Sequence, residues 1–388
     1  MKYNFLVITS SYPAISGDSF EGACIEVFAQ ALAHLGHNVI ILTQCTRRSY
    51  YKDANELTVK RFQWSKQVKP LSTLRPKYDF GKIYLYFSKG LNMATRIIRE
   101  NKIDFTLCAW ALPSGLFGLY LKKRYGIPYV IWALGSDIWS YSTSSISRSI
   151  LRIILNNALN IYVDGLSLVE KIHDIKRKKA AFLPTSRILP QIVSSDLMLN
   201  PSQIHFLFVG RYHVNKGPDI LVAAIQLLSF TMQAKSFFHF FGIGDMREYL
   251  KSMIEKNNLG HCIDLNGPIN NYALSQYLEK VDYTVIPSRV ESIPVILSDA
   301  LQKKCPIIAT NVGDMGRLLT QYGIGHLSQK AEPNNLAEIL SAAILNKNIV
   351  KDRMQRLYNI FDPDVNAKNF LQDLARYRGK NTPFADVM

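Results

Sequence analysis

The sequence predicts an α/β protein with parallel sheets, divided into domains. Short apolar runs alternate with segments of helical apolar spacing, which is the pattern of strands joined by crossover helices. The 388 residues correspond to two or three domains of about 150 residues each. Segment 189–201 has no periodicity and is bounded by prolines, which predicts a linker. We therefore expect a first domain over 1–188, a second over 202–362 and a terminal segment over 363–388.

The composition limits the classes of protein to consider. Apolar residues make up 48% of the sequence, enough for sizeable cores, and no segment is low in complexity. The five cysteines are scattered and form no C-x-x-C pair, which predicts reduced thiols in a cytosolic protein rather than disulfides or a zinc site. The N-terminus leads into a strand without a secretory apolar segment. The uncharged run Phe105–Leu121 is broken by Pro113, so we predict no transmembrane helix.

The net charge of +16 is concentrated in the first half of the chain. Residues 1–200 carry 26 Lys and Arg and 13 Asp and Glu, against 20 and 17 in residues 201–388. This asymmetry points to an anionic partner for the first half, either nucleic acid or an anionic membrane surface. Solubility alone is the alternative. No recognisable nucleic-acid-binding module is present, so we expect no nucleic acid partner.

The first half alternates strands with helices. Gly36 closes the first helix, as glycine commonly does just past a helix C-terminus. The G-x-G-x-x-G fingerprint is absent, which disfavours a dinucleotide-dependent oxidoreductase. We expect strands at Asn4–Thr9, Asn38–Thr43, Leu57–Phe62, Asp104–Trp110, Tyr129–Leu134 and Ala180–Leu183, and helices at Ala23–Leu35, Asp79–Glu100 and Ser145–Ala158.

The predicted helix Ser145–Ala158 is amphipathic, with isoleucines opposed to arginines. Core packing is the expected role of such a stripe, although the arginines leave an interfacial role open. The stripe consists of Ile146, Ile150, Ile153 and Ile154.

A basic loop between Lys66 and Tyr78 could contact phosphate head groups or be merely solvated.

The second half repeats the α/β pattern. Its expected strands are Gln203–Val209, Phe237–Phe241, His261–Leu265 and Tyr283–Ile286, and its expected helices are Asn271–Glu279, one from about Pro294, and Pro363–Tyr377.

The helix from Pro294 is a candidate anion site. Proline suits the first helical position, with Ser292 or Ile293 as the cap, and the N–H groups at a helix start attract anions. Glu291 precedes the helix, and Asp299 lies roughly 12 Å along its axis. Two solvated acids on an ordinary βαβ unit are the simpler interpretation.

The acid pair lies between a Pro-Ser strand end and a Pro-Ile-Ile-Ala-Thr strand. This arrangement resembles the signature of family 4 glycosyltransferases. The resemblance implies a GT-B fold, with two Rossmann-like domains facing across a cleft and a C-terminal helix returning to the first domain. It implies that Glu291 contacts the donor sugar, that Asp299 takes the ribose hydroxyls, and that amides near Ser292, Ile293, Pro294 and Val295 assist. Asp299 stands where Glu is usual, and Ser292 stands where Gly is usual.

A second match is the turn Gly210–Gly217, which resembles the family's Gly-Arg…Lys-Gly turn. The resemblance places Arg211 and Lys216 against the donor diphosphate. Two fixed cations there would stabilise the charge that a nucleotide leaving group gains. The turn at Gly244 matches a family Gly-x-Gly turn, and Ile269 matches the position beside the nucleobase.

The first half matches more loosely. Gly22 matches the glycine whose backbone faces the donor diphosphate, and Gly17 matches the mobile loop before it. A simple turn is the alternative for Gly22. Gly135 and Asp137 match the family's His-Gly-x-Asp turn, but Leu134 replaces the histidine. We include Asp137 among the expected catalytic residues, although a helix cap would also explain it.

The resemblance implies a retaining enzyme that transfers a sugar from a UDP- or GDP-sugar to a glycan or lipid-linked acceptor, in surface polysaccharide or glycolipid synthesis. No Asp-x-Asp or His cluster near these matching turns offers a metal site, so neither metal nor cofactor is expected. We expect a cytoplasmic protein, peripheral on the inner face of the membrane. A nucleotide-sugar epimerase of the same fold and a non-catalytic partner subunit remain alternatives.

Overall fold

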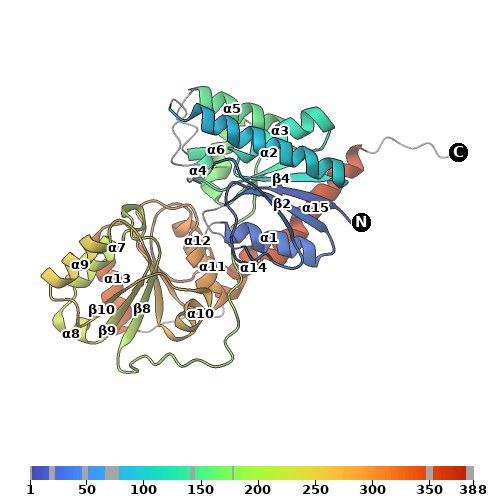
Figure 1. Cartoon of the computed structure of the whole chain (residues 1–388). Coiled ribbons are helices and arrows are strands. Elements are labelled where there is room, and N and C mark those ends of the chain that lie inside the picture. Colours follow the sequence, from blue (N-terminus) through green and yellow to red (C-terminus); the bar gives the residue numbers. More distant parts are fainter. Residues whose placement is uncertain are drawn as a thin grey trace. The chain divides into compact units, whose positions relative to one another are not determined.

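The chain forms two compact α/β units. The computed structural model describes residues 2–16, 22–45, 51–65, 78–139, 145–176, 179–346 and 353–381. Unit 1 comprises Met1–Thr185 and Phe361–Met388, and unit 2 comprises Ser186–Ile360. Each unit has one parallel sheet flanked by helices (Figure 1). The predicted α/β class is therefore confirmed, as is the return of the C-terminal helix to the first unit.

The sheet of unit 1 has the order β3-β2-β1-β4-β5-β6-β7, and every pairing is parallel. The order reverses between β1 and β4, so the loops after these two strands diverge at the carboxyl edge. The strands are β1 Asn4–Ile8, β2 Asn38–Gln44, β3 Thr58–Phe62, β4 Phe105–Ala109, β5 Tyr129–Ala133, β6 Ile161–Val163 and β7 Ala181–Phe182.

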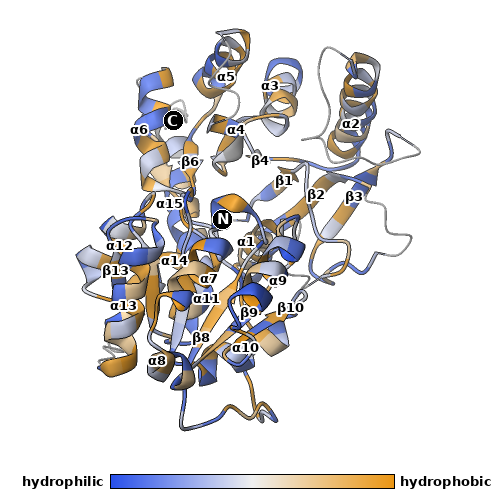
Figure 2. Ribbon diagram, turned by 90° about the vertical axis from the view of Figure 1, so that its left-hand side faces the viewer, coloured by the Kyte–Doolittle hydropathy of each residue, from blue (hydrophilic) through white to orange (hydrophobic). Residues whose placement is uncertain are grey.

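Helices cover both faces of this sheet. Helices α1 (Ala23–His34) and α15 (Pro363–Asn381) share one core cluster with β1, β2 and β4. The opposite face carries α2, α3, α5 and α6 (Figures 1 and 2). These helices span Phe80–Glu100, Ser114–Tyr125, Ser145–Asn157 and Leu166–Lys176, and a short α4 spans Ser136–Trp139.

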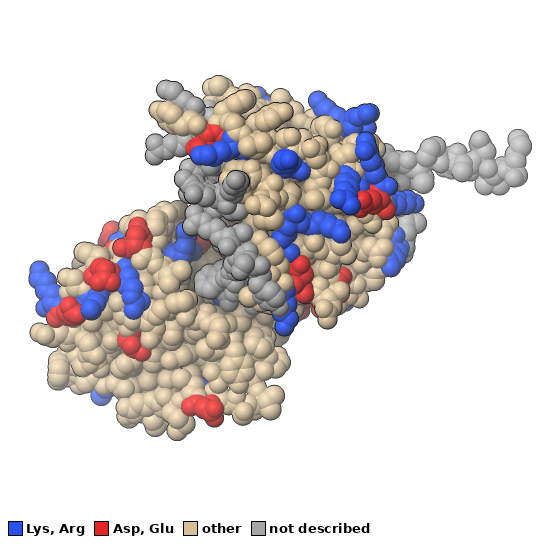
Figure 3. Space-filling view, viewed as in Figure 1, with Lys and Arg blue, Asp and Glu red and all other residues tan. Residues whose placement is uncertain are grey.

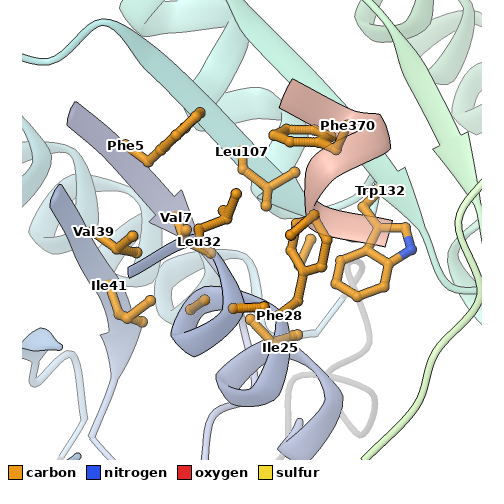
Figure 4. Packing of buried hydrophobic residues seen from close by; sticks show 14 of the residues in the cluster. Phe5, Val7, Ile25, Phe28, Leu32, Val39, Ile41, Leu107, Trp132 and Phe370 are labelled. Carbon is orange, nitrogen blue, oxygen red and sulfur yellow. The ribbon is translucent and has the colours of Figure 1, made fainter. Parts of the chain in front are cut away.

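Phe370 fixes the C-terminal helix α15 to unit 1. Its ring centroid lies 5.4 Å from that of Phe28 in α1 and 5.1 Å from that of Tyr162 in β6. Figure 4 shows Phe370 beside Phe28 and Trp132, with Phe5 and Leu107 nearby. Because Phe370 is only 1% exposed, it contributes the burial of a whole aromatic ring to this contact.

The sheet of unit 2 has the order β10-β9-β8-β11-β12-β13, again all parallel. Its order reverses between β8 and β11. Figure 2 shows predominantly hydrophobic strands in this sheet, as expected when helices cover both faces. The strands are β8 Ile204–Val209, β9 Ser236–Phe241, β10 Ile263–Asn266, β11 Tyr283–Ile286, β12 Ile307–Thr310 and β13 His326–Ser328.

The helices of unit 2 follow its strands in crossover positions. They are η2 Val214–Lys216, α7 Pro218–Gln226, α8 Phe230–Ala234, α9 Arg247–Lys256, α10 Asn271–Lys280, α11 Val295–Gln302, α12 Met315–Tyr322, α13 Pro333–Leu345 and α14 Met354–Phe361, whose last residue belongs to unit 1.

The segment predicted as a linker, 189–201, lies within unit 2, because the chain divides after Thr185. It has no regular structure, but side chains of α10 and α11 hold its backbone. Ser275 Oγ and Lys303 Nζ donate hydrogen bonds of 2.7 and 2.9 Å to the carbonyl of Pro190. Because polar contacts to its backbone hold this segment, it does not need apolar side chains at regular spacing. Its sequence therefore resembles that of a linker.

Two local expectations were wrong. We expected Ser292 or Ile293 as the cap of α11, but Pro294 is the N-cap, with an extended backbone (φ −74°, ψ 141°), and the helix begins at Val295.

We expected the isoleucine stripe of α5 to pack in the core, but Ile146 and Ile153 are 73% and 51% exposed. The core face of α5 consists instead of Leu151, Ile154 and Leu155.

Candidate functional site

The candidate donor residues lie after β8 and β11, at the point where the strand order of unit 2 reverses. In open α/β sheets, ligands bind in the crevice outside the carboxyl ends of the strands at such a reversal. The loop after β8 carries Arg211 and Lys216, and the loop after β11 carries Glu291. The topology therefore brings residues about 75 positions apart to one edge of the sheet.

Backbone hydrogen bonds join these two loops. The carbonyl of Asn215 accepts hydrogen bonds from the N–H groups of Arg289 (2.8 Å) and Val290 (3.2 Å). The Arg289 guanidinium donates to both carboxylate oxygens of Asp219 (2.7 and 2.6 Å) and to the carbonyl of Val214 (2.9 Å). A bidentate arginine–carboxylate pair fixes orientation as well as distance, so the loop after β11 is held against the start of α7.

Two glycines permit the close packing of the loops. Gly217 has a φ of +67°, and a Cβ there would lie 2.0 Å from the carbonyl oxygen of Pro287. Gly313 has a φ of +55°, and its Cβ would lie 2.0 Å from the carbonyl oxygen of Glu291. Any side chain would force these loops apart, so both glycines set the shape of the donor site.

Lys216 and Glu291 form an ion pair between the two loops. The Lys216 ammonium donates a hydrogen bond to Glu291 Oε2, and the side chains are 25% and 15% exposed. Arg211 is exposed and forms no ion pair or side-chain hydrogen bond with any residue that the structure describes. The structure thus places the two predicted cationic loop positions and the predicted sugar-side acid in two neighbouring loops at one edge of the sheet.

The segment before α11 has polar groups that the protein itself leaves without partners. Helix α11 has no side-chain cap. The hydroxyl oxygen of Ser292 is buried and has no hydrogen-bond partner among the described residues. Ile293 and Pro294 are buried, whereas Val295 is half-buried. An uncapped helix start has N–H groups available to an anion.

Asp299 does not have the surroundings that we expected of a ribose ligand. Its side chain is 0% exposed, and both carboxylate oxygens accept hydrogen bonds from Arg187. Burial raises the pKa of Asp299, and the Arg187 guanidinium opposes that rise. The carboxylate is thus enclosed and paired in this structure, and its contact with the ribose hydroxyls stays a prediction from the family resemblance. Sequence reasoning did not identify Arg187 as its partner.

Gly244 and Ile269 follow β9 and β10, beside the candidate crevice on the same sheet edge. A Cβ at Gly244 would lie 2.2 Å from the carbonyl oxygen of Tyr212. Ile269 is 9% exposed and immediately precedes Asn270, which caps α10. Gly244 therefore fixes the packing of its turn against the loop after β8, and Ile269 is mostly buried.

In unit 1, Gly22 is the N-cap of α1, with a φ of +89°. A Cβ there would lie 2.4 Å from the carbonyl oxygen of Ser11. Its position is therefore restricted to glycine by the packing of the loop after β1. Gly17 and the basic loop 66–77 lie outside the described residues.

Asp137 is a buried carboxylate held by backbone groups of two loops. It is 2% exposed, and its two oxygens accept hydrogen bonds from the N–H groups of Ala111 and Leu134. Burial raises its pKa to about 6, and four backbone hydrogen bonds oppose the rise. Asp137 therefore ties the loop after β4 to the loop after β5. Asp137 is the second residue of α4 rather than its N-cap, and its catalytic role stays a prediction from the family resemblance.

Helices α2 and α5 of unit 1 expose large apolar side chains. Phe80 and Tyr84 in α2 are 74% and 64% exposed, and Ile146 in α5 is 73% exposed. Both helices contact α3 on the same face of the sheet. Figure 3 shows Lys and Arg side chains over unit 1 where Figure 1 draws α2 and α15. The exposed side chains of these two helices lie on more than one side of each helix, and we call them together the apolar-basic face; they include Phe80, Lys82, Tyr84, Lys89, Ile146, Arg148, Ile150, Arg152 and Ile153.

Two features are absent from the part of the chain that the structure describes. None of the helices described is both long and apolar enough to span a membrane. Within the described ranges, no group of three or more His, Cys, Asp or Glu side chains is placed to hold a metal ion.

Two family models match consecutive parts of the chain. A model described as glycosyl transferase 4-like matches residues 14–165, and one described as glycosyl transferases group 1 matches residues 194–359. The chain belongs to the group 1 glycosyltransferases. This glycosyltransferase is 25% identical to the putative teichuronic acid biosynthesis glycosyltransferase TuaC of Bacillus subtilis, over 94% of this chain and 96% of TuaC. It is 26% identical to an uncharacterized glycosyltransferase of Methanocaldococcus jannaschii, over 69% of this chain and 72% of the relative.

Solved glycosyltransferase structures share the fold of this glycosyltransferase. Sucrose-phosphate synthase from Thermosynechococcus elongatus superposes with a TM-score of 0.80 at 17% identity, covering 98% of this chain and 100% of that one. HepE of Anabaena, solved with UDP and glucose, has a TM-score of 0.68 at 13% identity, covering 98% of this chain and 100% of that one. These similarities confirm the GT-B fold. The family models and the two relatives described above confirm the assignment as an enzyme of the transferase class.

Proposed function

We propose that this glycosyltransferase transfers a sugar from a UDP- or GDP-sugar to a hydroxyl of a glycan or lipid-linked acceptor, with retention at the anomeric carbon. The observation that carries the proposal is the meeting of Arg211, Lys216 and Glu291 at the reversal of strand order in unit 2. HepE, which shares the fold, was solved with UDP-glucose. That complex supports a nucleotide-sugar donor.

Arg211 and Lys216 are proposed to bind the donor diphosphate. Transfer breaks the bond between the anomeric carbon and a phosphate oxygen, and the nucleotide diphosphate leaves with additional negative charge. Cations at that position stabilise the charge as it develops. The ion pair between Lys216 and Glu291 supports this role, because it shows that the ammonium reaches from one loop to the other. The exposed side chain of Arg211 would supply the second cation.

Glu291 is proposed to contact the donor sugar, with Ser292 and the amides at the start of α11 assisting. The buried hydroxyl of Ser292 and the uncapped helix start support this assignment. We assign no protein nucleophile. The acceptor oxygen would form the new bond on the face from which the diphosphate departs, and the acceptor proton would pass to the leaving phosphate oxygen. Gly22, Gly17, Gly244 and Ile269 stay predictions from the family resemblance.

We further propose a place in surface polysaccharide or glycolipid synthesis, peripheral on the cytoplasmic face of the membrane. The relative TuaC is described as a putative teichuronic acid biosynthesis glycosyltransferase, which supports a role in surface polysaccharide synthesis. The apolar-basic face supports the membrane location, because basic residues attract anionic lipids while exposed Ile and aromatic side chains enter the interface.

Transfer of sugar from radiolabelled UDP- and GDP-sugars to a total lipid extract and to isolated glycans tests the proposed reaction. We expect one donor to label one acceptor class, Glu291→Ala to abolish the labelling, and nuclear magnetic resonance of the product to show the anomeric configuration of the donor. An inverted product would contradict the retaining mechanism. A wild-type protein that isomerises the donor sugar would instead indicate an epimerase.

A further inference from the structure

Two tryptophans lie at the carboxyl edge of the unit 1 sheet, in segments that follow neighbouring strands. Trp110 comes directly after β4, where the strand order reverses, and Trp139 ends α4, which follows β5. Trp139 is 45% exposed and Trp110 is half-buried. The other two tryptophans of the chain, Trp64 and Trp132, are buried, and their indole N–H groups donate to protein oxygens. Trp64 and Trp132 thus belong to the core, whereas the edge pair, which we call the tryptophan platform, reaches the surface.

Trp110 is held in a backbone conformation that a bulky side chain disfavours. Its φ is +67°, in the left-handed region that is rare for such residues. Its N–H donates to the carbonyl of Trp132 (2.9 Å), and it packs against the core cluster that includes Trp132. Strained residues of this kind cluster at ligand sites, where the surrounding structure holds them. The turn alone does not require a tryptophan, because glycine adopts this conformation without strain.

One buried carboxylate connects the two segments that carry the tryptophan platform. Asp137 accepts hydrogen bonds from the N–H of Ala111, which follows Trp110, and from the N–H of Leu134, which follows β5. Asp137 itself lies two residues before Trp139 in α4. The loops after β4 and β5 are therefore held together, and both tryptophans are carried by one connected part of the sheet edge.

Neighbouring groups hold the exposed indole of Trp139 in place. A Cβ at Gly135 would lie 3.9 Å from Cδ1 and 4.0 Å from Nε1 of this indole, so the ring lies against the glycine backbone. Lys171 Nζ in α6 is 5.8 Å from the ring centroid, within the range of a cation–π contact. A ring that is already fixed loses little side-chain freedom when a ligand binds to it.

We propose that the tryptophan platform binds the acceptor of this glycosyltransferase by stacking against the C–H face of a pyranose ring. The faces of an indole ring are electron-rich, whereas the C–H groups of a sugar carry partial positive charge. The position after β4 supports this role, because ligands bind outside the carboxyl ends of strands where their order reverses. The donor is proposed to bind unit 2, so the ring bound in unit 1 is the acceptor's. Only this naming of the sugar rests on the proposed function.

Fluorine nuclear magnetic resonance of protein labelled with fluorotryptophan tests the platform without any donor. The chain gives four signals, of which Trp110→Gly and Trp139→Leu assign two, and the buried Trp64 and Trp132 supply the other two as internal controls. The probes are the methyl glycosides of glucose, galactose, mannose, rhamnose and N-acetylglucosamine, at up to about 100 mM because single sugars bind weakly. We expect one glycoside to shift the Trp110 and Trp139 signals saturably and to leave the control signals in place.

Two results of this titration would overturn the proposal. The first is that no glycoside shifts either platform signal, or that all four signals shift alike. The second is that lipid vesicles, added in place of the glycosides, shift the platform signals when the glycosides do not. That result would assign the exposed indoles to a membrane surface.

Transfer kinetics separate the tryptophan platform from the donor site. With the acceptor fraction that the wild type labels, Trp110→Gly and Trp139→Leu should each raise the apparent acceptor KM about 3- to 10-fold and leave kcat nearly unchanged. Affinity for UDP or GDP should stay at the wild-type value. Tyr120→Leu is the control, because this tyrosine is 39% exposed in the middle of α3.

An unchanged acceptor KM in both variants would overturn the acceptor role even where the nucleotide still binds. Failure of the wild type to bind any nucleotide would instead contradict the proposed function, and the fluorine spectra would still decide whether the two indoles bind a sugar.

Discussion

Lys216 donates a hydrogen bond to Glu291 across the reversal of strand order in unit 2. The two side chains are 25% and 15% exposed, and their pair holds a cation and an acid together at the loops after β8 and β11. We expect substitutions of the two residues to have different effects on nucleotide diphosphate binding. Lys216→Ala should weaken nucleotide diphosphate binding about 10- to 100-fold through loss of a charged hydrogen bond. Glu291→Ala should leave that affinity within about threefold, since its contact is to the sugar.

Calorimetry with the diphosphate alone distinguishes these two residues. Lys256→Ala in α9 is the control, because this lysine is exposed at the end of a helix of the same unit. Equal losses of diphosphate affinity in Lys216→Ala and Glu291→Ala would mean that the ion pair acts as a unit and that the sugar-side assignment is wrong.

Arg289 should affect donor binding although it is not proposed to contact the donor. It joins the loop after β11 to Asp219 and to the carbonyl of Val214. Arg289→Ala should lower the free energy of unfolding by about 1 kcal/mol, since the arginine is 33% exposed, and weaken diphosphate binding several-fold. Denaturant titration and calorimetry measure the two effects. Unchanged diphosphate affinity would show that the loop keeps its position without this pair.

Phe370 should be essential for the attachment of α15 to unit 1. Phe370→Ala removes a ring that is 1% exposed and that contacts Phe28 and Tyr162. We expect a loss of about 3–5 kcal/mol in the free energy of unfolding and faster proteolysis near the C-terminus. Val365→Ala, on the exposed side of the same helix at 39% exposure, is the matched control. Equal stability of the two variants would contradict the packing described.

His239 should make unit 2 less stable in acid. His205 Nε2 is 2.9 Å from the carbonyl of Asn200 and therefore donates, so neutral His205 accepts at Nδ1 from His239 Nε2 (3.1 Å). Burial, assisted by His205 and opposed by Asp264, lowers the pKa of His239 to about 4. As the pH falls, the histidine binds a proton in the unfolded chain before it does so in the folded one. The contribution of His239 to the free energy of unfolding is therefore complete above about pH 6.5 and is lost as the pH drops towards 4.

Between about pH 6.5 and pH 4, His239 lowers the free energy of unfolding by up to about 3 kcal/mol. Denaturant titration of wild type and His239→Phe at pH 7 and pH 4.5 measures it. We expect the difference between the two pH values to shrink in the variant. A variant with the full wild-type pH dependence would assign the acid sensitivity to other groups.

The apolar-basic face should bind anionic membranes. Ile146 and Ile153 are 73% and 51% exposed beside Arg148 and Arg152. Wild-type protein should float with vesicles that contain anionic lipid but not with neutral vesicles, and Ile146→Ser with Ile153→Ser should reduce flotation several-fold. Val193→Ser, at a fully exposed valine of unit 2, is the control. Absence of the wild type from both vesicle types would contradict the membrane location.

The sequence was sufficient for most of the strands, although not for β6 and β13, and for the loop positions of Arg211, Lys216 and Glu291, because apolar periodicity and glycine-bearing turns are local signals. It was insufficient for Asp299, whose partner Arg187 lies 112 residues away in the chain. It was insufficient for α5 too, because the helix has apolar residues on two faces and periodicity does not tell which face meets the core. In each case the deciding contact is formed only by the tertiary fold.

The most direct test of the donor site is a calorimetric titration of the purified protein with UDP, GDP and ADP. It compares wild type with Arg211→Ala and with Arg356→Ala, an exposed arginine of α14 in the same unit. We predict saturable binding of UDP or GDP by the wild type and by Arg356→Ala, weakened at least about tenfold in Arg211→Ala. Equal binding by all three proteins, or no binding of any nucleotide by the wild type, would contradict a donor site at the reversal between β8 and β11.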